Sequence, residues 1–130
     1  MKAYFAHSME IYGSAEAGVA KAKIKRLLPG CTVIDPENID WVLLEQKYGS
    51  EGAFRRAVFT SDMVVVLENE GFVGRGVYCE IRAALGQKKQ VFVLRDNRLR
   101  EVSRAHVAKK GSNWKAYARV SIRQRFTRQK

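Results

Sequence analysis

The chain has few cysteines and no long apolar segment, and each absence excludes a class of protein. Its 2 cysteines, Cys31 and Cys79, lie far apart among 130 residues. This spacing suggests neither a disulfide framework nor a metal-binding cluster, so no metal is expected. No apolar run approaches the roughly 18 residues that cross a bilayer, and the N-terminus turns polar too soon for a signal peptide. We therefore expect a cytoplasmic protein without a membrane contact.

Acidic residues are almost absent from the last quarter of the chain. Residues 1–96 hold 13 Lys and Arg against 12 Asp and Glu, whereas residues 97–130 hold 11 Lys and Arg against one acid, Glu101. The body is therefore close to neutral, and the tail carries most of the net charge of +11. Such a surplus can attract polyanions such as nucleic acid, or it can be a solvated surface that aids solubility.

Short apolar runs alternate with segments of helical spacing. The pattern predicts strands at Ala3–Ala6, Thr32–Ile34, Met63–Leu67 and Val91–Leu94, and helices from Ser14 to Pro29-Gly30, over Glu37–Tyr48, Glu51–Thr60 and Val77–Leu85. Gly49-Ser50 separates the second and third helices. Strands that alternate with helices predict an α/β fold with a doubly wound, mainly parallel sheet of four to five strands. The expected strand order is 2-1-3-4, in a Rossmann- or flavodoxin-like three-layer sandwich.

The end of the chain gives weaker patterns. Leu99–Lys110 has the composition of a basic helix, Trp114–Ile122 fits both the helix and the strand period, and residues after Phe126 are expected to fray. We assign residues 1–96 to an α/β nucleotide-binding core and residues 97–130 to a basic C-terminal extension of the same domain.

Polar residues gather where the predicted strands end. In a doubly wound sheet, ligands bind beyond the carboxyl ends of the strands, where the strand order reverses. The loops 6–14, 35–40 and 68–80 would meet there. With the first strand they supply the candidate site residues Tyr4, His7, Ser8, Tyr12, Asp35, Glu68, Glu70, Gly74, Arg75, Gly76 and Glu80. Hydroxyls, a histidine, an arginine and carboxylates suit a sugar phosphate or a nucleotide. Each also has a structural interpretation, such as a capping role for Ser8.

Glu80 is the most informative of these residues. It lies about one turn into a predicted helix, just beyond Gly74-Arg75-Gly76. A carboxylate there lies in the field of the helix dipole, which would keep it ionised, and it could attack the anomeric carbon of a sugar. Arg75 and the amides around Gly74 and Gly76 could hold a phosphate. The alternative is purely structural, because glycine-rich turns often precede helices.

Two blocks of sequence resemble the nucleoside 2-deoxyribosyltransferase superfamily, which includes the 2'-deoxynucleoside 5'-phosphate N-hydrolases. They are residues 4–9, YFAHSM, and residues 61–88, with SDMVVV at their start and GRGVYCEI around Glu80. The resemblance covers about residues 3–95. It implies that Glu80 is the nucleophile, that Tyr4 contacts it, that no cofactor is needed and that the chain forms a homo-oligomer.

The chain departs from this family at two positions. Gly74 stands where the phosphate-preferring hydrolases carry a serine for the 5'-phosphate. The family's general-acid aspartate would fall within residues 53–57, AFRRA, which contain no carboxylate. Glu68, Glu70 or Asp35 could substitute for it.

Three functions follow from the sequence. The first is an enzyme of the N-glycosidic bond, a transferase or hydrolase of nucleosides or nucleotides that uses Glu80. The second is a non-catalytic module that binds or sequesters nucleotides, which the missing aspartate favours. The third is a protein that binds nucleic acid through residues 97–130.

Overall fold

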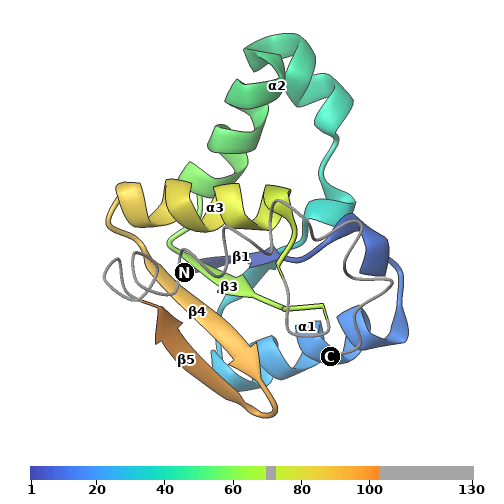
Figure 1. Cartoon of the computed structure of the whole chain (residues 1–130), viewed down its shortest axis with the longest axis vertical. Coiled ribbons are helices and arrows are strands. Elements are labelled where there is room, and N and C mark those ends of the chain that lie inside the picture. Colours follow the sequence, from blue (N-terminus) through green and yellow to red (C-terminus); the bar gives the residue numbers. More distant parts are fainter. Residues whose placement is uncertain (70–72, 103–130) are drawn as a thin grey trace.

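Five strands form one mixed sheet in the computed structural model, which describes residues 1–69 and 73–102. They lie in the order β2-β1-β3-β4-β5 (Figure 1). The first four are parallel, and β5 runs antiparallel to β4. The predicted α/β class, the mainly parallel sheet and the order 2-1-3-4 are confirmed. The strands are β1 (Lys2–Ala6), β2 (Thr32–Ile34), β3 (Met63–Val66), β4 (Gln90–Arg95) and β5 (Arg98–Val102).

Helices cover both faces of this sheet. They are α1 (Ala15–Leu27), α2 (Trp41–Phe59) and α3 (Arg75–Gly86). Phe5 of β1 packs toward α1, in a cluster with Ile24. Its neighbour Tyr4 points to the other face and packs with residues of α2 and α3. Because successive side chains of a strand alternate between faces, β3 and residues 3–6 of β1 are buried on both sides of the sheet, and no charged residue lies within these stretches.

Helix α2 begins later than the sequence pattern predicted. The predicted start was Glu37, but Asp40 is the N-cap of α2, and its side chain accepts a hydrogen bond from the Leu43 N–H at 3.1 Å. Glu37 lies instead in a 3-10 turn, Pro36–Asn38. The prediction was wrong because proline and acidic residues suit the first turn of either kind of helix. The 3-10 turn keeps Glu37 near the carboxyl end of β2.

The predicted break at Gly49-Ser50 is present as a kink within α2. Gly49 has a φ of 80° and a ψ of 167°, which is outside the helical region and open mainly to glycine. The part of α2 before the kink projects away from the sheet in Figure 1. Its side chains Val42 and Leu43 are exposed.

The chain turns back after β4 and does not continue into the predicted basic helix. Leu99–Val102 belongs to β5, and Leu99 pairs with Leu94 across a hairpin whose turn contains Asp96 at a φ of 58°. The prediction of a helix over Leu99–Lys110 was therefore wrong for its first four residues. Leu99 and Val102 have the spacing of a helix face, but in β5 they pack on opposite sides of the sheet. The remaining tail predictions, including Trp114–Ile122, lie outside the described residues.

No helix in the described part of the chain is both long enough and apolar enough to cross a membrane.

Candidate active site at the carboxyl edge of the sheet

A buried hydrogen bond joins β1 to α3 where the strand order reverses. The Tyr4 hydroxyl donates to Oε2 of Glu80 at 2.5 Å, between residues 76 positions apart in the chain. Tyr4 is fully buried and Glu80 is 9% exposed. A contact this short from a hydroxyl to a carboxylate is a strong, charge-assisted hydrogen bond. The structure thus brings together the two residues that the resemblance singles out.

Burial raises the pKa of Glu80 from its ordinary value of 4.5 to about 7, and the hydrogen bond from Tyr4 opposes this rise. From its place in the sequence, Glu80 is expected to be kept ionised by the helix dipole. That expectation was wrong, because α3 begins at Arg75 and Glu80 is its sixth residue. The favourable field is confined to the first turn, so desolvation dominates the balance.

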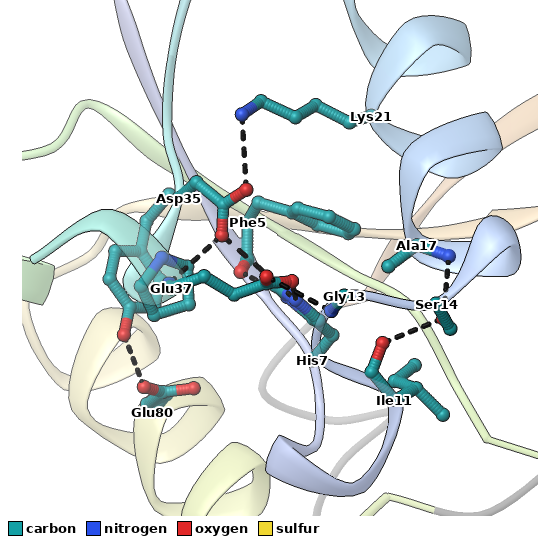
Figure 2. A network of polar contacts seen from close by, with 12 residues as sticks. Phe5, His7, Ile11, Gly13, Ser14, Ala17, Lys21, Asp35, Glu37 and Glu80 are labelled. Atoms are coloured by element: carbon teal, nitrogen blue, oxygen red, sulfur yellow. Dashed lines mark hydrogen bonds and ion pairs between the residues drawn. The ribbon is translucent and has the colours of Figure 1, made fainter.

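A second polar cluster lies at the ends of β1 and β2 (Figure 2). His7 follows β1, and its Nε2 lies 3.0 Å from Oε2 of Glu37. Oε1 of Glu37 accepts a hydrogen bond from the Gly13 N–H at 3.0 Å. Asp35 accepts a hydrogen bond from the Glu37 N–H at 3.0 Å and pairs with the Lys21 ammonium at 3.1 Å. These contacts join the loop after β1, the loop after β2 and α1.

Tyr12 lies near both groups of carboxylates. Its ring is tilted against that of His7, with 4.8 Å between the ring centroids. Burial raises the pKa of Tyr12 to about 12, and the charges of Glu80, Asp35 and Glu37 add to this rise. Because the pKa of this one side chain responds to all three carboxylates, we assign the three carboxylates to one site.

His7, Asp35 and Glu37 also form a set with metal-binding side chains, since one ligand atom from each lies within 4.8 Å of the others. The contacts in place argue against this use. The Lys21 ammonium already neutralises Asp35, and His7 contacts Glu37 directly at hydrogen-bond distance. A divalent cation would have to displace both contacts. We therefore assign the cluster to hydrogen bonding rather than to a metal.

The other predicted site residues have structural roles, are exposed or lie outside the described residues. The Ser8 side chain accepts a hydrogen bond from the Glu10 N–H at 3.3 Å and so caps a short 3-10 helix. Glu68 pairs with Arg95 through both of its oxygens, at 2.9 and 3.0 Å, so its carboxyl is engaged elsewhere. Gly74 is the N-cap of α3. The two residues that follow, Arg75 and Gly76, are exposed. Glu70 lies outside the described residues.

Glu37 is the site residue that the sequence argument missed. It had been placed at the start of a helix, and its contact with His7 depends on the pairing of β1 with β2. A signal was present, because Glu37 follows Asp35-Pro36 directly after a predicted strand, within a loop already expected at the site.

No family model, no curated protein and no solved structure matches this chain. Functional inference therefore depends on the residues and their geometry.

Proposed function

We propose that this protein cleaves the N-glycosidic bond of nucleosides or nucleotides, with Glu80 as the nucleophile, and that it is a member of the nucleoside 2-deoxyribosyltransferase superfamily. The observation that carries the proposal is the hydrogen bond from Tyr4 to Glu80. It holds a buried carboxylate at the edge of the sheet where doubly wound folds bind their ligands.

Glu80 has the chemistry that the first step needs. Its carboxylate attacks the anomeric carbon as the bond from that carbon to the base breaks, and the bonding electrons leave with the base. Water, or a second base in a transferase, then attacks the same carbon and releases Glu80. Two displacements at one carbon retain its configuration.

Tyr4 supports Glu80 in two ways. Its hydroxyl fixes the carboxylate in one orientation, and it lowers the pKa of Glu80 against the opposing effect of burial. Because only the ionised carboxylate attacks, turnover increases as the pH rises through about 7.

The start of α3 suits the phosphate of a nucleotide. Arg75 lies exposed in the first turn, next to the N-cap Gly74, which provides no side-chain hydrogen bond to the helix. The N–H groups at a helix start and a nearby guanidinium are both favourable partners of a phosphate. A nucleoside 5'-monophosphate is therefore the preferred substrate class within the proposal.

The test is base release from nucleosides, 2'-deoxynucleosides and their 5'-monophosphates by wild type and by Glu80→Gln. The expected result is free base from wild type and none above background from Glu80→Gln. Glu45→Gln is the matched control, because it makes the same chemical change on the exposed surface of α2.

Two results would contradict the proposal that the protein is an enzyme that uses Glu80. Equal base release by wild type and Glu80→Gln would remove Glu80 from the mechanism. Saturable binding of a nucleotide without base release over hours would favour the non-catalytic binding module.

A further inference from the structure

The contacts of His7 require a proton between its ring and Glu37. Nδ1 of His7 lies 2.9 Å from the carbonyl oxygen of Phe5, which can only accept, so Nδ1 carries a hydrogen. Nε2 lies 3.0 Å from Oε2 of Glu37. If Glu37 is ionised, Nε2 must donate and the ring is an imidazolium. If the ring is neutral, Glu37 must donate. In either state, the pair holds one proton between these two atoms.

The charges around the pair agree with this count. The groups that face it are Lys21 from α1, Asp35 at the end of β2 and Tyr12 from the loop after β1. Lys21 pairs with Asp35, so their charges cancel. A pair of His7 and Glu37 with one shared proton is neutral as well. The cluster as a whole therefore has no net charge, which is the least costly state for partly buried ionisable groups.

Only one member of the pair is open to a ligand. The His7 side chain is 0% exposed and the Glu37 side chain is 24% exposed. Oε1 of Glu37 is held by the Gly13 N–H, so the carboxyl has a fixed orientation. The shared proton can therefore reach a ligand through Glu37. The buried His7 ring holds the Glu37 carboxyl in place on the side away from solvent.

The pair and Glu80 lie along the same edge of the sheet. Tyr4, which binds Glu80, pairs in register with Ile34 of the neighbouring strand β2. His7 lies three residues after Tyr4, and Glu37 lies three residues after Ile34, so both extend past the strand ends. The His7 ring stacks on the ring of Phe5, and Tyr12, which contacts His7, also lies within electrostatic range of Glu80. A ligand whose sugar lies at Glu80 would therefore extend toward Glu37.

We propose that Glu37, supplied by His7, is the general acid that protonates the leaving base. This proposal rests on the proposed function. It provides the proton donor that residues 53–57 lack, and it replaces Glu68, whose carboxyl is paired with Arg95.

Glu80 forms a bond to the anomeric carbon, the carbon–nitrogen bond breaks, and its electrons stay on the base. The proton of the pair passes through Glu37 to a ring nitrogen of the base, which leaves neutral, and the pair becomes a neutral imidazole and a carboxylate. In hydrolysis, water then attacks the anomeric carbon, the bond to Glu80 breaks, and the proton of the water returns to the pair.

The test compares two leaving groups in Glu37→Gln. A purine 2'-deoxynucleoside needs protonation to leave, whereas the 4-nitrophenolate of a 4-nitrophenyl 2-deoxyriboside does not. We expect Glu37→Gln to lose about 10²- to 10⁴-fold in kcat/KM on the nucleoside and to stay within a few fold of wild type on the nitrophenyl compound. Glu80→Gln is expected to lose both activities, and the control Glu45→Gln neither.

The outcomes separate this proposal from the proposed function. Full nucleoside activity in Glu37→Gln would overturn the general acid and leave the enzyme intact. Equal losses on both substrates would also overturn it, because Glu37 would then be structural. A wild type that cleaves neither substrate would overturn the function and the acid together.

A second measurement does not depend on turnover. We expect a proton resonance far downfield in the NMR spectrum, coupled to the His7 ring and absent in Glu37→Gln, because the amide variant holds no shared proton. A wild type without this resonance, with Nε2 of His7 bare at neutral pH, would overturn the proton count.

Discussion

Three carboxyl groups lie at one edge of the sheet in two opposite electrostatic settings. Asp35 and Glu37 have one setting, and Glu80 has the other. Asp35 pairs with the Lys21 ammonium, and Glu37 contacts the His7 ring. Glu80 is buried in the core cluster with the hydroxyl of Tyr4 as its donor, and no cation pairs with it among the described residues. The first group is compensated by charge. Glu80 has no such compensation, so burial raises its pKa. A raised pKa of this kind is characteristic of a group kept for chemistry rather than for stability.

The largest expected effect is on turnover. Glu80→Gln keeps the size of the side chain and an oxygen that can accept from Tyr4, but it removes the nucleophile. We expect base release to fall by about 10³-fold or more, since removal of a covalent nucleophile has effects of at least that size in other enzymes. Near-normal turnover would show that the difference between the two groups has no catalytic meaning.

The same variant should change how stability depends on pH. Between pH 4.5 and about 7, folded Glu80 holds a proton that the unfolded chain has lost, so the free energy of unfolding falls as pH rises. The shift corresponds to roughly 3 kcal/mol at 1.36 kcal/mol per pKa unit. Glu80→Gln should therefore be more stable relative to wild type at pH 8 than at pH 4. Denaturant unfolding of both proteins across this range measures it, and a constant difference would contradict the raised pKa.

Removal of the Tyr4 hydroxyl should increase the difference in electrostatic setting between Glu80 and the compensated carboxyl groups. Tyr4→Phe deletes the donor that lowers the pKa of Glu80, so the rise of kcat/KM with pH should move to higher pH. At pH 7 we expect a loss of about 10- to 100-fold, which corresponds to a hydrogen bond to a charged group. Activity should recover in part at pH 9. A uniform loss at every pH would instead indicate that Tyr4 only positions Glu80.

The smallest expected effect concerns the compensated group. Lys21→Gln removes the cation from Asp35, and its side chain is 29% exposed, so solvent replaces part of the contact. We expect a loss of about 1 kcal/mol in the free energy of unfolding. The ascending limb of the pH–rate profile, which reports Glu80, should not move. A shift of that limb would show that the two groups titrate as one unit.

The sequence predicted the parts of the fold that depend on local pattern. The apolar runs, together with their alternation with helices, predicted the strand order of the sheet. Ser14 predicted the start of α1, and Gly49 predicted the kink in α2. Leu99–Val102 was misassigned, because Leu99 and Val102 have helical spacing, whereas pairing with β4 places them on opposite sides of the sheet.

The site was less predictable because it depends on contacts between distant segments. The resemblance pointed to Tyr4 and Glu80, and the structure contains their hydrogen bond. The direction of the Glu80 pKa was missed, because burial by β1 and α3 cannot be read from the residues around position 80. Glu37 was missed because its partner His7 lies 30 residues away, directly after the neighbouring strand β1.

The central claim is that Glu80 forms a covalent bond to the sugar, and a trapped intermediate tests it most directly. A purine nucleoside with fluorine at the 2-position of the sugar slows both displacements, because fluorine destabilises the positive charge that develops at the anomeric carbon. The account predicts an increase in protein mass equal to the fluorinated sugar, located on Glu80 and absent in Glu80→Gln. An adduct on another residue, or released base with no adduct on Glu80, would contradict it.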